Sequence, residues 1–277
     1  MKRFLFITVL LIAAACTREK DIPVDTGRYV VEGWIDSGGA PVVMVSSPVT
    51  AQYASQSVAS LREHIVWWAD VTVSDDQGNE VALTGRWDDD YLPPFIYTTD
   101  KMRGVPGRHY TLKVRYNNRE ASGTTYIPQP MMLEDFTVTP ANGLETDSLF
   151  AVTAHFRKPP EGTFYRFFTM VEGRDSTWCP STLSGVTIAG NSVSILRGWS
   201  ARSLWHQPLF RRGETIHVKC CTVDEAVYGF WSGFDEVVNL APIPIFQMTD
   251  PLESNLQGAY GYWAGYGATY GKVVIDP

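Results

Sequence analysis

The sequence has few charged residues, few cysteines and no apolar run long enough to span a membrane. Charged side chains make up 19% of the 277 residues, and the formal net charge is −7. An acidic chain does not suit the phosphate backbone of a nucleic acid, so we expect no nucleic-acid partner. Four cysteines are too few for a disulfide-rich scaffold. The fold must therefore depend on apolar packing.

Motifs of common catalytic and cofactor sites are also missing. The five histidines include no H-E-x-x-H and no pair spaced i, i+4 for zinc. No G-x-S-x-G, P-loop, C-x-x-C or helix-opening G-x-G-x-x-G occurs. The acidic run 88–90 lacks the spaced oxygens that Ca²⁺ needs, which favours a solvated turn. We expect no catalytic residue, metal or cofactor, although a Ser-His-Asp triad is recognised only by geometry.

Apolar, aromatic and turn-forming residues are abundant instead. The chain is 44% hydrophobic and 13% aromatic, with 23 glycines and 17 prolines. Such a composition can bury a core and predicts many short strands joined by turns. At about 150 residues per domain, the length predicts one or two domains.

The N-terminus resembles a lipoprotein signal peptide. A short basic segment precedes an apolar run over residues 4–15, which is too short for a membrane span but suits a signal peptide. Three alanines then precede Cys16, matching the small residues that a lipoprotein signal peptidase needs. We predict a signal peptide over residues 1–15 and a lipidated tether over residues 16–27 that anchors the protein to a bilayer through Cys16. The alternative is an ordinary secretory signal.

Residues 28–127 predict an immunoglobulin-like or fibronectin-like β-sandwich. Apolar and polar residues alternate over short runs, and glycine or asparagine turns separate the runs. Asn117 and Asn118 suit a type I′ turn. Strands are predicted over residues 29–35, 41–46, 69–74, 80–84, 110–116 and 119–127.

The segment 128–130, Pro-Gln-Pro, is the best linker, and a second β-rich domain is predicted over residues 131–277. A short packing helix is predicted after Asp224 as the N-cap, because four apolar residues follow at helical spacing. The glycine- and aromatic-rich segment 258–271 is interpreted as a tail before a last strand. Strands are predicted over residues 136–138, 149–156, 164–172, 186–188, 192–196, 214–223 and 272–275.

Three cysteines remain if Cys16 is lipidated. Cys220 and Cys221 are adjacent in a predicted strand, so their side chains should point to opposite faces and not bond to each other. In an oxidising envelope Cys179 could pair with either of them. The alternative is three thiols.

Most aromatic residues are expected in β cores, but two segments predict an interface. Prolines place Tyr91, Leu92 and Phe95 in an exposed loop, and Trp67 and Trp68 stand together in a polar stretch. Exposed apolar loops usually contact a partner. We therefore predict that these five residues lie at an interface.

Five sequence patterns occur in a fixed order behind the signal segment, at residues 29–35, 69–75, 104–114, 156–166 and 254–258. In this order they resemble a family of Bacteroidota lipoproteins catalogued as a domain of unknown function, number 4249. Lys-Pro-Pro at 158–160 departs from the pattern, where an acidic residue before proline is more typical. The resemblance implies an outer-membrane lipoprotein, often encoded near a TonB-dependent receptor, and supplies no catalytic residues.

The favoured function is that of a non-enzymatic, surface-exposed outer-membrane lipoprotein. It would act as a binding partner or accessory of a TonB-dependent receptor in nutrient capture and uptake. A structural or adhesive cell-surface β-sandwich lipoprotein is one alternative. A surface hydrolase is the other.

Overall fold

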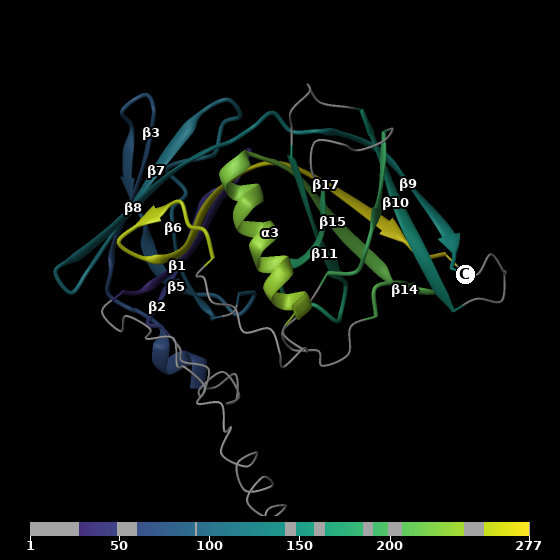
Figure 1. The fold of residues 1–277 in the computed structure, drawn as a ribbon, viewed down its shortest axis with the longest axis horizontal. Helices are drawn as coiled ribbons and strands as arrows, with labels where there is room; N and C mark the ends of the chain where they lie inside the picture. The colour runs from purple at the N-terminus through teal and green to yellow at the C-terminus, as the bar shows by residue number, and fades with distance from the viewer. Residues whose placement is uncertain are drawn as a thin grey trace, which may run out of the picture.

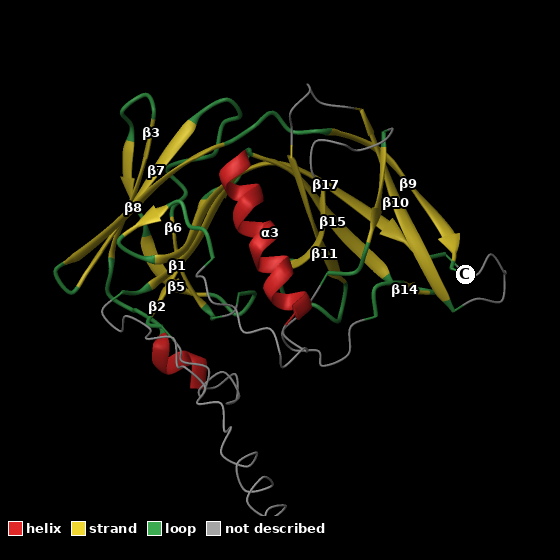
Figure 2. Ribbon diagram, viewed as in Figure 1, coloured by secondary structure: helices red, strands yellow, loops and turns green. Residues whose placement is uncertain are grey.

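The computed structural model describes eight stretches of the chain, mostly as β-strands (Figures 1 and 2). The predicted signal peptide, Cys16 with its tether, and the predicted strand 186–188 lie outside the described residues. The predicted mostly-β fold with sandwich-like packing is confirmed. The described residues are 28–48, 60–91, 93–141, 148–157, 164–184, 191–198, 207–240 and 252–276.

The elements follow the chain in two groups, before and after the predicted linker. The first group is β1 (Val30–Asp36), β2 (Pro41–Ser46), the 3-10 helix η1 (Ser60–His64), β3 (Asp70–Asp75), β4 (Glu80–Ala82), β5 (Thr84–Trp87), β6 (Phe95–Thr98), β7 (His109–Tyr116) and β8 (Arg119–Tyr126). The second group is β9 (Met132–Pro140), β10 (Leu149–Arg157), β11 (Phe164–Val171), β12 (Cys179–Ser184), β13 (Ser192–Ile195), β14 (Phe210–Arg211), β15 (Thr215–Val223), α3 (Glu225–Leu240), β16 (Leu256–Gln257) and β17 (Tyr260–Val274).

The first sandwich packs a five-stranded sheet, in the order β16-β8-β7-β3-β4, against β1 and β2. Tyr110, Leu112 and Val114 on β7 are buried, because alternate side chains of a strand point to the same face. Asn117 and Asn118 have positive φ angles of 49° and 59°, as a type I′ turn requires. The alternation of apolar and polar residues therefore predicts correctly which face of β7 packs against the core.

A second, smaller sheet covers the other half of the molecule. It has the order β13-β10-β14, and β9 also pairs with β10. Its inner face packs on β11 and β15, with Phe156, Phe167 and Ile216 buried between the layers. In Figure 1, β3, β7 and β8 lie at one end of the molecule and β9 and β10 at the other.

β17 joins the two halves of the central sheet, whose order is β12-β11-β15-β17-β1-β2-β6-β5. Residues 260–266 pair in parallel with β1, and residues 267–274 pair antiparallel with β15. The segment 258–271, predicted as a tail, thus supplies most of a 15-residue central strand. That prediction is wrong.

The predicted division into domains 28–127 and 131–277 also needs correction. Two hydrophobic cores do form largely on either side of it. Leu256, Ala259 and Trp263 nevertheless lie in the first core, although they follow the boundary. The chain returns to the first sandwich through β16 and β17, so the halves share one sheet.

Glycines explain why the sequence pattern does not predict a strand at β17. A Cβ atom added at Gly265 would clash with the carbonyl oxygen of Tyr126, and one at Gly267 with that of Pro128. The backbone that leaves β8 therefore crosses β17 at a distance that only glycine allows. Glycine also lowers strand propensity, which hides the strand from a sequence pattern.

α3 lies on the opposite face of the central sheet from the two small sheets, in front of β11, β15 and β17 (Figure 1). The predicted N-cap is confirmed, because Asp224 Oδ1 accepts a hydrogen bond from the backbone N–H of Val227 at 2.8 Å. Val227, Phe230 and Trp231 of the predicted apolar stripe are buried against the sheet. No helix among the described residues is both long and apolar enough to cross a bilayer.

Of the two alternatives left open for the cysteines, the structure does not contain the possible disulfide between Cys179 and either Cys220 or Cys221. All three side chains are buried, and none is in a disulfide. Cys179 lies on β12 and the other two on β15, with β11 between these strands. Two strand spacings of about 4.8 Å exceed the roughly 7 Å between Cα atoms that a disulfide spans. Cys220 and Cys221 do point into different cores, as predicted.

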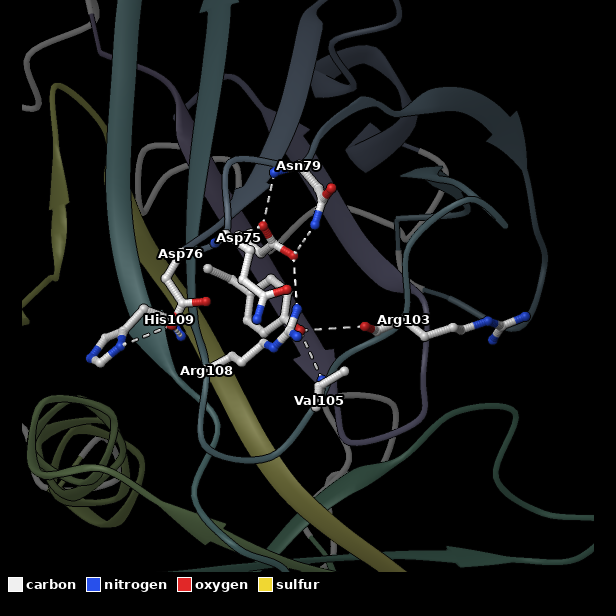
Figure 3. A network of polar contacts seen from close by, with 9 residues as sticks. Asp75, Asp76, Asn79, Arg103, Val105, Arg108 and His109 are labelled. Atoms are coloured by element: carbon white, nitrogen blue, oxygen red, sulfur yellow. Dashed lines mark hydrogen bonds and ion pairs between the residues drawn. The ribbon is translucent and has the colours of Figure 1, made fainter.

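A polar network closes the turn between β3 and β4 (Figure 3). The Asp75 carboxylate accepts hydrogen bonds from the backbone N–H groups of Gln77 and Asn79, at 3.0 and 2.9 Å. It also accepts one from the Asn79 side chain at 2.8 Å and pairs with Arg108 at 3.1 Å. Desolvation opposes ionisation of Asp75, but these hydrogen bonds and the charge of Arg108 together hold its pKa below the usual value.

Candidate functional site

Three tryptophans lie at the surface near the β5 edge of the central sheet. Trp67, Trp68 and Trp87 are 40%, 89% and 42% exposed. Large apolar side chains are normally covered, and a group of them at the surface indicates a contact site. We call these three residues, with the neighbouring Phe95 and Arg62, the tryptophan patch.

The segment that carries Trp67 and Trp68 is fixed by a buried tyrosine. The hydroxyl of Tyr97 donates to the carbonyl of Val66 at 2.7 Å and accepts from the backbone N–H of Ala69 at 3.0 Å. These two bonds hold the backbone on both sides of the tryptophan pair. Burial raises the pKa of Tyr97, so its hydroxyl remains protonated and able to donate.

Trp87 stands at the end of β5 and packs into a ladder of rings. Its ring is stacked on Trp67, with centroids 6.0 Å apart and planes 10° apart. Trp67 also contacts Phe95, the cross-strand partner of Trp87, at 4.8 Å. The guanidinium of Arg62 lies 4.9 Å from the Trp87 ring centroid, within range of a cation–π contact. The ladder therefore orders side chains that solvent still reaches.

The ladder depends on a small residue in β5. A Cβ atom added at Gly85 would lie 2.6 Å from the ring of Phe95 and 3.3 Å from that of Tyr97. Glycine at this position lets the Phe95 ring lie over the strand. Phe95 in turn supports Trp67.

Acidic residues border the patch. The Trp87 indole N–H donates to Asp89 at 2.8 Å, and Asp88 pairs with Arg86 at 2.9 Å. Asp89 and Asp90 are exposed, which confirms the solvated turn predicted for 88–90. Within the described part of the chain, no three His, Cys, Asp or Glu side chains are grouped so that they could hold a metal ion.

The predicted interface residues do not form one surface. Trp67 and Trp68 are exposed as predicted, and Phe95 contacts Trp67 but is half-buried at the start of β6. Tyr91 is also half-buried and packs on Trp34, with ring centroids 6.0 Å apart. The prediction that Tyr91 and Phe95 lie in an exposed loop is therefore wrong. The two side chains pack on opposite faces of the central sheet.

Burial also raises the pKa of Tyr91, and the nearby Asp88 raises it further. Leu92 lies outside the described residues.

Two residues of the patch, Trp87 and Arg62, are not predicted from the sequence. The position of Trp87 directly before the acidic run 88–90 indicates that it lies near solvent. Its exposure, however, depends on β5 lying at the edge of the sheet, which a sequence pattern does not show.

A second unusual arrangement lies beneath α3, where charged side chains are buried. Arg166 on β11 has no exposed surface and forms two bonds to Asp235 of α3, at 2.6 and 3.0 Å. Its guanidinium lies 4.4 Å from the Trp231 ring centroid. This bidentate pair and the cation–π contact attach α3 to the sheet.

A buried lysine continues this arrangement across the sheet. Lys219 Nζ on β15 donates to Asp36 Oδ1 on β1 at 2.7 Å, and the Tyr270 hydroxyl on β17 donates to Asp36 Oδ2 at 2.6 Å. The ammonium lies 4.7 Å from the Tyr266 ring centroid. Burial and the charge of Asp36 raise the pKa of Tyr270. We call Asp36, Arg166, Lys219, Asp235 and Tyr270 the α3 ion cluster.

The two arrangements differ in what they offer chemically. The α3 ion cluster has its charges paired; it links β11 to α3 through Arg166 and links β1, β15 and β17 to one another through Asp36, which is a structural role. The tryptophan patch presents apolar rings with polar edges to solvent, which suits binding of another molecule. The patch is therefore the stronger candidate for function.

One Ser–His contact bears on the hydrolase alternative. Ser47 Oγ lies 2.9 Å from His64 Nδ1. Backbone pairing places these residues together, because the N–H of Ser47 donates to the carbonyl of His64 at 2.8 Å. In a Ser-His-Asp triad the serine faces Nε2 instead.

Comparison with known proteins gives one family. The family described as a domain of unknown function (DUF4249) matches residues 17–271. The search of curated proteins gave no match.

Proposed function

This chain belongs to the DUF4249 family, and from that premise we propose that it is a lipid-anchored outer-membrane protein that binds another protein and is not an enzyme. The proposed partner is a TonB-dependent receptor, for which it acts as a surface accessory in nutrient capture and uptake. Three features support this proposal: the tryptophan patch, the predicted lipid anchor and the absence of catalytic motifs from the sequence.

The tryptophan patch carries the proposal. Trp and Arg are the residue types that contribute most to protein–protein binding, usually within a rim of polar groups. Trp67, Trp87 and Arg62 form such a centre, and Asp89 lies at its border. The ring ladder and the Tyr97 hydrogen bonds fix these side chains before binding, which lowers the entropy cost of ordering them.

The predicted anchor makes a membrane partner accessible. The tether over residues 16–27 can extend at most about 40 Å at roughly 3.5 Å per residue. A protein held this way samples the layer directly above the bilayer. A receptor in the same membrane is therefore within its reach.

Copurification tests the proposal. The chain is recovered by affinity from detergent-solubilised outer membranes, and we expect a TonB-dependent receptor to be recovered with it. A Trp67→Ala, Trp87→Ala double variant should lower that recovery at least tenfold. Met132→Ala is the matched control, because Met132 is 59% exposed and lies on β9, which belongs to a different sheet from Trp87.

Two outcomes would contradict the proposal. One is recovery of the chain alone and monomeric from cells that express the neighbouring receptor. The other is equal receptor recovery with the double variant and the wild type. A deletion strain with normal uptake but altered surface attachment would favour the adhesive alternative, and labelling of Ser47 by a fluorophosphonate would favour the hydrolase.

A further inference from the structure

The two edges of the central sheet differ in what lies beside them. At one edge, β12 is tied to the smaller sheet by side-chain hydrogen bonds. The Ser181 hydroxyl donates to the carbonyl of Leu196, and the Thr182 hydroxyl donates to that of Ser194 at 3.0 Å. At the other edge, β5 has β6 on one side and no further strand of the described residues in the sheet order on the other. The β5 edge is therefore the open one.

A hydrogen bond at the end of β5 shows which of its backbone groups face β6. The two strands pair antiparallel, and the N–H of Asp88, directly after β5, donates to the carbonyl of Pro94 at 3.2 Å. Bonded and non-bonded positions alternate along an antiparallel ladder. Two and four residues before Asp88, the backbone groups of Arg86 and Thr84 therefore bond to β6 as well.

The intervening residues, Gly85 and Trp87, direct their backbone groups away from β6. Leu83 is two residues before Gly85 and follows the same alternation, because its N–H donates to the carbonyl of Val71 on β3 at 2.8 Å. Among the described residues, none forms a hydrogen bond with the backbone of Gly85 or Trp87 on this outer side. The edge thus presents two N–H donors and two carbonyl acceptors.

An edge of this kind suits an extended polypeptide. An extended chain carries N–H and carbonyl groups at the spacing of β5 and can pair with it as a further strand. Lysine, proline and bulges usually protect sheet edges from such pairing. β5 contains neither residue type, and its pairing with β6 has no register shift. Its four residues limit the added strand to a short segment.

The tryptophan patch borders this edge. Trp87 is the cross-strand partner of Phe95, and its ring is stacked on Trp67. Alternate side chains of an added strand would lie on the same face as the Trp87 ring, and the others would lie beside Arg86 on the opposite face. The patch and the open edge can therefore contact one and the same segment.

We propose that the partner binds by strand addition, in which a short extended segment of the TonB-dependent receptor pairs with Gly85 and Trp87. This inference rests on the proposed function and adds the mode of binding to it. The backbone hydrogen bonds provide affinity, and the tryptophan patch selects apolar side chains at every second position of the segment. The patch alone would accept an apolar surface of any backbone conformation.

Photo-cross-linking tests the proposal in the receptor complex recovered from detergent-solubilised outer membranes. The photoreactive residue p-benzoylphenylalanine replaces Arg86 in one full-length variant and Trp68 in another. The Arg86 side chain is 60% exposed and points away from the patch, so a partner that covers only the patch does not contact it. We expect cross-links to the receptor from both positions.

The same replacement at Met132 is the matched control. Met132 is 59% exposed and lies on β9, an edge strand of a different sheet, so we expect no cross-link from it. Peptide mapping should place the cross-links from position 86 within one extended segment of the receptor. Far-UV circular dichroism confirms that each variant is folded.

Hydrogen–deuterium exchange, read at single amides, tests the backbone bonds without any substitution. In the free chain the amides of Gly85 and Trp87 should exchange readily, whereas those of Thr84 and Arg86 are protected by β6. In the complex we expect exchange at Gly85 and Trp87 to slow by about tenfold or more, with a smaller change at Thr84 and Arg86.

The outcomes separate this inference from the proposed function. A receptor that cross-links from position 68 but not from position 86, with exchange at Gly85 and Trp87 unchanged, overturns strand addition and leaves the receptor as partner. Cross-linking of position 86 to a second copy of this chain overturns the receptor as occupant of the edge. If no receptor is recovered at all, the proposed function fails and the inference fails with it.

Discussion

The tryptophan patch and the α3 ion cluster reverse the usual placement of apolar and charged side chains. In the patch, Trp68 is 89% exposed, whereas in the cluster Arg166 has no exposed surface and Lys219 only 3%. Both belong to the central sheet or lie at its edge. The same sheet therefore exposes large rings at one place and buries cations at another.

The difference teaches which arrangement serves stability and which serves binding. Buried charges require partners, and each cation of the cluster has one within 2.7 Å. Exposed rings need no partner to fold, and their removal should cost little stability. We expect substitutions in the two regions to act on different measurements, which the following variants test.

The largest effect is expected for Lys219→Ala. The change leaves Asp36 buried without its cation, and breaking such a pair costs about 3–5 kcal/mol of unfolding free energy. Urea unfolding followed by tryptophan fluorescence measures the loss. The double variant Lys219→Ala, Asp36→Ala should be less destabilised than the sum of the single variants. A loss below about 1 kcal/mol for Lys219→Ala would show that the Lys219–Asp36 pair contributes no more stability than a surface salt bridge does.

A smaller effect is expected where α3 begins. Asp224→Ala removes the acceptor for the Val227 N–H and should lower the unfolding free energy by about 1 kcal/mol. Glu236→Ala is the control, because Glu236 is an exposed acidic residue of the same helix. Equal effects of the two substitutions would show that the Asp224 cap adds no stability to α3.

Protonation of Asp75 should destabilise the fold in acid. Its pKa is lower in the folded chain than its ordinary value of 3.8, so its stabilising contribution is complete above that value and is lost as the pH falls through the folded pKa. Asp75→Asn should therefore flatten the fall in melting temperature as the pH decreases below about 4. An unchanged slope would assign the acid sensitivity to other carboxylates.

The smallest effect on stability is expected for Trp68→Ala. A side chain that is 89% exposed should change the unfolding free energy by less than about 0.5 kcal/mol. Trp231→Ala is the buried counterpart, and its loss from beneath α3 should cost about 3–5 kcal/mol. Similar values for the two tryptophans, measured in the same urea titration, would contradict the distinction between exposed rings of the patch and rings buried beneath α3.

Sequence patterns predicted the local structure well. Alternation located most strands of the first sandwich, two asparagines marked the turn after β7, and Asp224 marked the start of α3. These features depend on neighbouring residues, which a sequence displays directly. The exposed pair Trp67 and Trp68 was predicted for the same reason.

Features that depend on distant segments were missed. Gly265 and Gly267 of β17 look like tail residues until the backbone after β8 is placed against them. Arg166 looks like a solvent-facing position of β11 until Asp235 of α3 meets it, and Lys219 looks like one of β15 until Asp36 and the Tyr266 ring are placed beside it. Trp87 is exposed only because β5 ends the sheet.

The position of β17 in the chain has a consequence for how the protein acquires its fold. It follows every other strand, yet one of its contacts, from Tyr262 to Glu32, spans 230 residues. Neither sandwich can close its core until this last strand has emerged and inserted between β1 and β15. Such long-range pairing predicts slow, cooperative folding, in which both halves become protease-resistant together.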